Sequence, residues 1–313
     1  MIELVVDMGT ANTKIFKSGS GVVLVEPSVV LLKRKGTKRQ FIAAGKDVEK
    51  ADVLPSGSEI VCPIDKGFIT DIEMAGEMLA CFINRFTPKS IIPPRIKIRF
   101  LTPAGATKED KIKFEKAAHC VNLEEVEFIS WPELMTKGLG REEFTTLIAD
   151  LGAGKTDIVI VKDGELLTGA TFDIGGNDMD LSIKEYVEYR YGVEISEKSA
   201  RNAKITAGSL YKNDSASIEV TGRALINNNE TSLNLTAVEL SKVLYEYYYK
   251  FFEMIDNILT LVPAEIVKEV KDEGVFFSGG ASLMPGLSKL ANEIMRISIN
   301  MVDEPLLEAF KGL

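Results

Sequence analysis

Short runs of hydrophobic residues with strand-like spacing occur at the start of the chain and again near its middle. The pattern predicts strands at 2–7, 13–17 and 21–32, and a second set at 145–150, 156–162 and 165–173. In each set the first strand leads into a glycine-containing turn, and the next strand follows directly. The repetition indicates that one supersecondary unit of strand, tight turn and strand is used twice.

Helical spacing of apolar residues accounts for much of the remaining chain. Helices are predicted at 72–86, 107–120, from Pro132 onward, 177–191, 236–262 and up to about 296, with strands at 95–101, 126–129 and 274–277. Thr107 is suited to cap one of these helices, and Thr236 with Glu239 has the capping-box spacing at the start of the longest one. Alternation of strands and helices is typical of an α/β fold.

The length of 313 residues exceeds one ordinary hydrophobic core, so we expect two lobes. The core of lobe I is predicted at 1–32, 64–144 and 301–313, with 33–63 as an insertion that begins with the basic run 33–39. The core of lobe II is predicted at 145–176 and 235–300, with a smaller insertion at 177–234.

Composition narrows the class of protein. Hydrophobic residues make up 45% of the chain and charged residues 27%, which is typical of a folded soluble protein. The formal net charge of −9 argues against a general nucleic-acid binder. The three cysteines lack CxxC spacing, which favours buried free thiols in a reducing compartment. No apolar run is long enough to span a membrane, so a cytoplasmic protein is expected.

The two predicted turns share a chemical pattern. They read Asp7-Met-Gly-Thr-Ala-Asn-Thr13 and Asp150-Leu-Gly-Ala-Gly-Lys-Thr156. Glycine leaves backbone N–H groups open to an anion, and aspartate oxygens suit a hydrated Mg²⁺. Residues 149–156 also come close to a Walker loop, but a β-branched strand follows them where that motif requires a helix. The pattern therefore predicts two hairpin turns that hold a nucleotide's phosphates.

A third glycine segment, Gly274-Val-Phe-Phe-Ser-Gly-Gly-Ala-Ser-Leu-Met-Pro-Gly286, completes an order of motifs that resembles the actin superfamily. Within it the chain is most similar to the MreB/Mbl bacterial actins. This similarity is carried by the Asp7 turn, Val25-Glu-Pro-Ser-Val-Val30, Pro103-Ala-Gly-Ala-Thr107, Ile174-Gly-Gly176 with Asp180, and Pro305-Leu-Leu307.

The resemblance implies an actin-like α/β fold. It consists of two duplicated lobes around a nucleotide cleft, each a mixed five-stranded sheet with flanking helices, and small subdomain insertions. It also implies a cytoskeletal subunit that binds ATP and Mg²⁺, assembles into filaments and acts in cell shape, with paralogous actin subunits as further partners and no nucleic acid. A sugar- or acetate-kinase-like phosphotransferase of the same superfold is the alternative. A chaperone-type ATPase is disfavoured because the large heat-shock chaperones carry an additional peptide-binding domain.

The resemblance also assigns roles to individual residues. Asp7 and Asp150 would hold Mg²⁺ through water. The nucleotide would contact residues of the three glycine segments, of the Ile174 segment and of one helix, namely Gly9, Thr10, Ala11, Asn12, Gly152, Ala153, Gly154, Lys155, Gly175, Lys204, Gly279, Gly280 and Ala281.

The chain departs from the family pattern where hydrolysis is concerned. The family's Ile-Glu-Glu-Pro segment, which carries a water-positioning glutamate, aligns with Ile129-Ser130-Trp131-Pro132. Neither serine nor tryptophan orients a water as a carboxylate does, so we expect slow or absent ATP hydrolysis. Asp150 and Glu133 are weak catalytic candidates. Lys155 replaces a small residue and either adds a charge at the phosphates or points to solvent, and Thr206 stands in place of a glutamate near the ribose.

Membrane contact is a further implication of the resemblance, because the family uses a hydrophobic loop for it. The candidates here are Ile91 and Ile92, flanked by Lys89 and Arg95, and local packing under the turn is the alternative. Such contact would place the protein at the inner face of the membrane.

Overall fold

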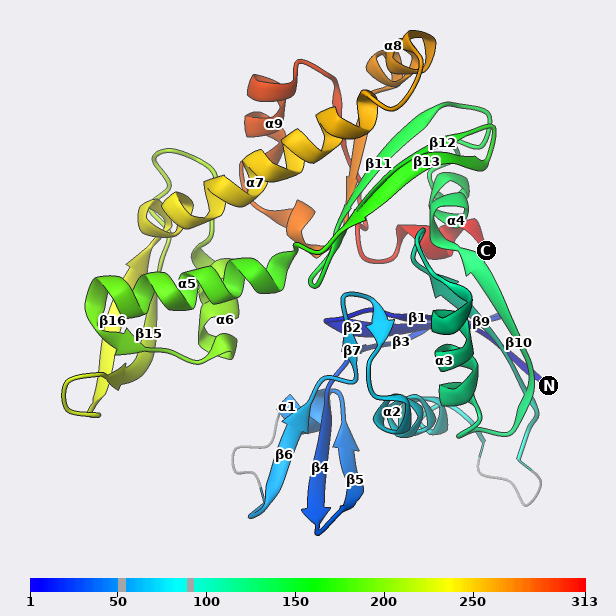
Figure 1. Ribbon diagram of the computed structural model, residues 1–313, viewed down its shortest axis with the longest axis horizontal. Helices are drawn as coiled ribbons and strands as arrows, with labels where there is room; N and C mark the ends of the chain where they lie inside the picture. The colour runs from blue at the N-terminus through cyan, green and yellow to red at the C-terminus, as the bar shows by residue number, and fades with distance from the viewer. Residues whose placement is uncertain (50–54, 89–92) are drawn as a thin grey trace. The chain divides into compact units, whose positions relative to one another are not determined.

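The computed structural model describes residues 1–49, 55–88 and 93–313, so the membrane candidates Ile91 and Ile92 lie outside the described residues. The chain forms two compact units (Figure 1). Unit 1 comprises Met1–Gly138 and Ala309–Leu313, and unit 2 comprises Leu139–Glu308.

A mixed five-stranded sheet forms the centre of unit 1. Its strand order is β10-β9-β1-β2-β3. The antiparallel part consists of β1 (Ile2–Met8), β2 (Asn12–Lys17) and β3 (Gly21–Pro27). On the other side of β1, β9 (Ile96–Thr102) and β10 (Leu123–Ser130) run parallel to it. The helices α2 (Ile72–Asn84), α3 (Lys108–Ala118) and α4 (Trp131–Gly138) complete this part of unit 1, together with most of the short 3-10 helix η2 (Glu308–Gly312).

Two smaller sheets lie between β3 and α2 in the sequence. One has the order β5-β4-β6, and the other pairs β7 with β8. Their elements are β4 (Val30–Lys35), β5 (Lys38–Ala44), α1 (Lys46–Glu49), β6 (Ser58–Val61), β7 (Ile64–Asp65) and β8 (Phe68–Ile69).

The single strand predicted at 21–32 is in fact two strands in different sheets. Strand β3 ends at Pro27, and β4 starts at Val30. Between them, the Ser28 amide donates to Ala11 O over 2.9 Å, so the chain is held at the first glycine turn and leaves the central sheet there.

Unit 2 repeats the central sheet of unit 1. Its order is β13-β12-β11-β17-β18. Strand β12 is antiparallel to both β11 and β13, whereas β17 and β18 run parallel to β11. The strands are β11 (Thr146–Leu151), β12 (Thr156–Lys162), β13 (Glu165–Phe172), β17 (Val275–Ser278) and β18 (Ile299–Met301). The strand directions match position by position, which confirms the predicted duplication and the mixed five-stranded sheet of each lobe.

The rest of unit 2 is mostly helical. It contains α5 (Gly176–Tyr191), α6 (Glu197–Ala207), α7 (Ala237–Leu259), α8 (Ala264–Glu273), the 3-10 helix η1 (Gly280–Leu283) and α9 (Leu287–Met295). A small sheet of β14 (Val193–Glu194), β15 (Ser217–Ala224) and β16 (Glu230–Thr236) packs against α6. Figure 1 shows α5 and α7 leading from the central strands of unit 2 toward this sheet.

Local sequence determines several helix ends. The predicted capping box of α7 is present, because Thr236 Oγ1 accepts from the Glu239 amide and the Glu239 carboxylate accepts from the Thr236 amide. Thr107 caps α3 in the same way with Asp110. Apolar residues of α7 at helical spacing are buried, namely Leu244, Tyr248, Phe251, Ile255 and Ile258, and the helix ends at Leu259, before the predicted end at 262.

Two surface properties bear on the sequence-based expectations. All three cysteines are free thiols, but Cys62 and Cys120 are exposed, so the prediction that they are buried is wrong. Among the described helices, none is both long enough and apolar enough to cross a bilayer.

Candidate nucleotide-binding segments

The candidate residues gather where parallel strands end. In unit 1, β1, β9 and β10 run in the same direction, so the turn after β1 and the start of α4 after β10 lie at one edge of the sheet. In unit 2, the turn after β11 and the segment after β17 share the equivalent edge. The carboxyl edge of parallel strands is where ligands bind in α/β proteins.

The first glycine turn is held by hydrogen bonds from both sides. The Gly9 amide donates to Asn12 O over 3.1 Å and closes the turn. Ser28 Oγ donates to Gly9 O over 2.7 Å, and the Gly67 amide donates to Thr10 Oγ1 over 2.9 Å. A Cβ on Gly9 would lie 2.9 Å from Asn12 O, closer than such atoms pack. The sequence assigned no role to Ser28 or Gly67, because both reach the turn from elsewhere in the chain.

Asp7 stands at the end of β1, directly before this turn. Its cross-strand neighbour in the register is Lys14, and Lys14 Nζ lies 2.7 Å from Asp7 Oδ2. The Asp7 side chain is still partly exposed, so this pairing leaves carboxylate surface at the edge of the sheet.

The second glycine turn repeats the geometry of the first. The Gly152 amide donates to Lys155 O over 3.0 Å, as Gly9 does to Asn12 O. A Cβ on Gly152 would lie 2.8 Å from Lys155 O. The two turns are therefore closed by the same hydrogen bond, and in both a side chain at the glycine position would collide with the carbonyl oxygen that accepts this bond.

The first turn of α5 packs directly on the second glycine turn. The amides of Gly176 and Asn177 donate to Gly152 O over 3.0 Å and to Ala153 O over 2.7 Å. A Cβ on Gly175 would lie 2.6 Å from Ala153 O, so this approach of two backbones requires glycine. The helix thus fixes the direction of the carbonyl groups in the turn.

The third glycine segment also approaches the second turn. Gly279 has φ +80°, and a Cβ there would lie 2.4 Å from Leu151 O. Gly280 is exposed, and Ala281 O accepts a hydrogen bond of 2.7 Å from the buried Tyr248 hydroxyl. Within unit 2 the structure therefore brings together the segments at 150–155, 175–177 and 279–281.

Lys155 is neither directed into solvent nor without a partner. Its amine is hydrogen-bonded to Asp157 Oδ2, and the Asp157 side chain is 2% exposed. Thr171 Oγ1 donates to the other oxygen of the same carboxylate. The solvent-exposed alternative for Lys155 is therefore wrong, because a buried aspartate holds the amine.

Lys204, on α6, contacts the first turn of α5. Its Nζ donates to Gly176 O and lies 2.6 Å from Asp180 Oδ1. Burial lowers the pKa of this amine, and the neighbouring Asp180 carboxylate opposes that shift. Arg201 Nε donates to the other Asp180 oxygen over 3.1 Å.

The residues at the position of the family's glutamates lie at the end of β10. Ser130 is the last residue of the strand and Trp131 the first of α4. The Trp131 indole N–H is buried and has no hydrogen-bond partner among the described residues. Glu133 is exposed in the first turn of the same helix. The segment 129–132 therefore offers a water molecule no carboxylate.

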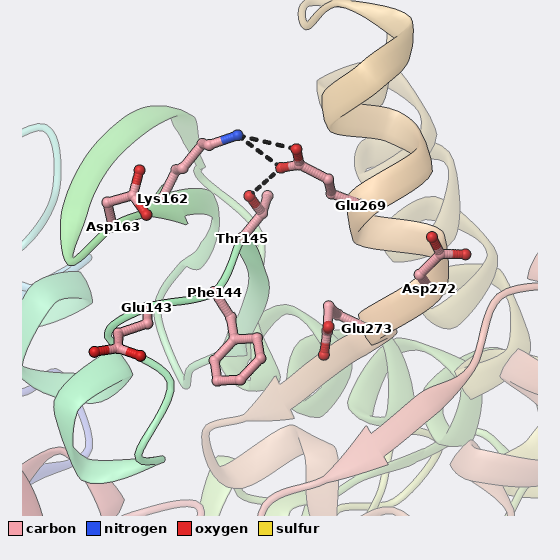
Figure 2. A pocket seen from close by; sticks show the side chains of 8 residues that line it. All are labelled: Glu143, Phe144, Thr145, Lys162, Asp163, Glu269, Asp272 and Glu273. Atoms are coloured by element: carbon pink, nitrogen blue, oxygen red, sulfur yellow. Dashed lines mark hydrogen bonds and ion pairs between the residues drawn. The ribbon is translucent and has the colours of Figure 1, made fainter.

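A separate cavity of about 350 Å³ lies in unit 2 at the other end of the β12 strand (Figure 2). Five of its lining residues are acidic, and it is lined by Glu143, Phe144, Thr145, Lys162, Asp163, Glu269, Asp272 and Glu273. Figure 2 shows Lys162 and Thr145 directed at the Glu269 carboxylate, with Lys162 Nζ 2.8 Å from Glu269 Oε2. This surplus of carboxylates repels phosphate, so the cavity is not a candidate nucleotide site.

Comparison with known proteins supports an actin-like assignment. The family model described as MreB/Mbl protein matches residues 1–313. The cell shape-determining protein MreB of Escherichia coli is 28% identical over 317 residues, covering 99% of this chain and 91% of that protein. The crystal structure of MreB5 of Spiroplasma citri bound to AMPPNP is similar with a TM-score of 0.91 at 25% identity, covering 99% and 94% of the two chains. The MamK double helical filament is similar in fold, with a TM-score of 0.80 at 20% identity and coverages of 99% and 97%.

These similarities confirm the predicted actin-like fold. They do not support the alternative of a sugar- or acetate-kinase-like phosphotransferase, because the match over the whole chain is to the cell-shape proteins. The duplicated sheets, the equivalent glycine turns and the full-length match lead to one conclusion, that the chain belongs to the MreB/Mbl family of bacterial actin homologues.

Proposed function

We propose that this chain is a cytoskeletal subunit that binds an adenine nucleotide with Mg²⁺, assembles into filaments with copies of itself and contributes to cell shape. The observation that carries the proposal is the equivalence of the turns at Gly9 and Gly152 at the ends of equivalent strands. Two further findings support it. The related MreB5 of Spiroplasma citri was crystallised with AMPPNP, and the fold is shared with the MamK filament subunit.

The residues present fit a nucleotide. Each turn is a cradle that a Cβ would fill, at 2.9 Å from Asn12 O in one and 2.8 Å from Lys155 O in the other. Backbone N–H groups in such turns bind phosphate oxygens. We assign the phosphates to the segments 9–12 and 152–155 with Gly175, and the adenosine to 279–281.

Mg²⁺ belongs to the same proposal. Among the described residues no group of three or more His, Cys, Asp or Glu side chains is placed to hold a metal by itself. Mg²⁺ keeps several waters and is commonly bound by one or two carboxylates and by phosphates. Asp7 and Asp150 would supply these carboxylates through water, and the nucleotide would supply the rest.

Hydrolysis is proposed to be slow. The segment that carries the family's water-positioning glutamate has Ser130 and Trp131 here, and the exposed Glu133 follows them on a helix that begins beyond the strand. The nucleotide would thus favour assembly through binding and would be cleaved rarely. The location is proposed to be the cytoplasm, with contact to the inner membrane face through Ile91 and Ile92.

Binding and assembly are measured separately on the purified chain. Titration with a fluorescent ATP analogue is expected to show Mg²⁺-dependent binding, and electron microscopy with Mg²⁺-AMPPNP is expected to show filaments. Asp7→Asn is expected to weaken Mg²⁺-nucleotide binding by at least about tenfold, corresponding to 1.4 kcal/mol. Asp163→Asn makes the same chemical change at the acidic cavity and is expected to leave binding unchanged. Absence of both binding and filaments in the wild type would overturn the proposal.

A further inference from the structure

The helix α6 contacts the candidate segment at 175–177, and the residues that follow α6 bond to the chain just after the segment at 279–281. Lys204 donates to Gly176 O at the start of α5, and the Gly176 amide donates to Gly152 O of the second glycine turn. Beyond the end of α6, the Leu210 amide donates to Pro285 O over 2.7 Å, and Tyr245 donates to Leu210 O over 2.6 Å. Pro285 follows η1, which contains Gly280 and Ala281.

Two of the three N–H donors of the Lys204 amine are directed at acceptors inside the protein. The side chain is 13% exposed, and its amine contacts Gly176 O and the Asp180 carboxylate, which is itself 4% exposed. A buried carboxylate requires a cation, and a buried ammonium requires acceptors. An amine held in this way is fixed in place by the protein before any nucleotide binds.

The partners of Lys204 are the groups that orient the glycine turn. Gly176 O accepts from Lys204, while the Gly176 amide donates to Gly152 O. Arg201 adds a second connection, because its Nη2 donates to Asn177 Oδ1 over 3.0 Å while the Asn177 amide donates to Ala153 O. Lys204 and Arg201 of α6 are therefore hydrogen-bonded to Gly176 and Asn177 of α5. These two α5 residues in turn donate to the second glycine turn.

We propose that Lys204 is a positioning residue for the phosphates: it fixes the first turn of α5 and thereby the carbonyls of Gly152 and Ala153, so that the amides of the turn face the nucleotide. The proposal rests on the proposed nucleotide-binding function and gives α6 a role within it. Because α6 also packs on β15 and β16, the same contacts link the phosphate turn to that small sheet.

The test compares ligands with and without phosphates by competition against a fluorescent nucleotide. Lys204→Met is expected to weaken ADP and AMPPNP about tenfold, the factor for 1.4 kcal/mol, while adenosine competes as well as it does with the wild type. Lys198→Met, an exposed lysine of the same helix, is the matched control and is expected to leave all three ligands unchanged.

A double-variant cycle protects the test against a folding defect. Removing one partner of a buried ion pair is far more harmful than replacing both. In the Lys204→Met/Asp180→Asn double variant the stability to urea is therefore expected to recover relative to Lys204→Met. Its ADP binding is expected to stay weakened, because neither change restores the donor to Gly176 O. Lys204→Arg keeps the charge and is expected to lose less than Lys204→Met.

Three outcomes would overturn the proposal. Lys204→Met could bind ADP as tightly as the wild type, its loss could extend equally to adenosine, or the double variant could regain the ADP affinity of the wild type. A loss that includes adenosine would indicate direct contact between the amine and the nucleoside. Recovery in the double variant would indicate that the Asp180 carboxylate left without Lys204, and not the lost bond to Gly176 O, caused the defect. Failure of the wild-type chain to bind any nucleotide is a different result and would refute the proposed function itself.

Discussion

Replacing Gly279 with alanine tests the strictest steric requirement in the candidate adenosine segment. Gly279 has φ +80° and ψ 165°, a backbone conformation that is almost restricted to glycine. The new Cβ would lie 2.4 Å from Leu151 O and 2.8 Å from Leu151 N. Leu151 is the last residue of β11 and is paired with Thr156 of β12, so its backbone cannot move away without breaking the sheet.

The expected magnitude follows from these two costs. Backbone strain of this kind costs about 1–3 kcal/mol. Forcing an extra carbon into packed structure costs about 1–3 kcal/mol more. We therefore expect Gly279→Ala to lower the free energy of unfolding of unit 2 by about 4 kcal/mol, in the middle of the combined range.

Urea denaturation followed by circular dichroism measures this loss, and the neighbouring glycine supplies the control. A Cβ on Gly280 would have Leu306 Cδ2 at 3.8 Å as its nearest neighbour, which is ordinary contact. Gly280→Ala is therefore expected to change the free energy of unfolding by no more than about 0.5 kcal/mol. If Gly279→Ala costs less than about 1 kcal/mol, the steric reasoning is wrong.

Three further perturbations address hydrolysis, helix capping and pH. Ser130→Glu with Trp131→Glu restores the two acids of the family segment and is expected to raise phosphate release by at least about a hundredfold, the usual contribution of general base catalysis; an unchanged rate would contradict the assignment of slow hydrolysis to these positions. Thr236→Ala removes the cap of α7 and is expected to lower the free energy of unfolding by about 1 kcal/mol in thermal or urea denaturation, with no change in the unfolding cooperativity. Hydrogen bonds from Lys162, and to a smaller extent from Thr145, lower the pKa of Glu269 below its ordinary value of 4.5, so its stabilising contribution is present above pH 4.5 and is lost as the pH falls through the lowered pKa. As the pH falls from 6 to the lowered pKa of Glu269, the free energy of unfolding is expected to decrease less in Glu269→Gln than in the wild type. Parallel pH profiles of the two proteins would contradict a stabilising role of the ionised Glu269.

Local patterns were sufficient for the repeated strands and the helix caps. The turns at Gly9 and Gly152 could be predicted because the steric need for glycine is encoded within a few residues, and the same is true of Thr236 with Glu239. By contrast, α8 escaped prediction, since its apolar side is limited to Ile266, Val267 and Val270 and only Val270 is fully buried. The break between β3 and β4 was missed because it depends on Ser28 bonding to a turn that lies far away in the sequence.

The partners of charged residues were the least predictable part of the candidate site. Lys204 could be nominated from its motif, but its contact with Asp180 depends on the packing of α6 against α5. The same limit applies to Asp157, whose burial follows from its position on β12, which lies inside the sheet between β11 and β13. Charge partners of this kind are set by tertiary structure and cannot be predicted from the spacing of residues along the chain.

Comparison of the two glycine turns explains why unit 2 has a lysine in its turn. In unit 1 the residue opposite Asp7 is Lys14, and the turn carries Asn12; in unit 2 the residue opposite Asp150 is Asp157. Asp157 is almost fully buried, and a buried carboxylate without a cation is costly, so Lys155 is needed to balance it before any nucleotide binds.

It follows that weaker ATP binding by Lys155→Met does not by itself indicate a phosphate contact, because the variant also removes the cation that pairs with the buried Asp157. Only a loss that persists when Asp157→Asn is added would assign the amine to the phosphates. Recovery in that double variant would instead mean that Lys155 acts by pairing with Asp157 and so holds the turn in shape.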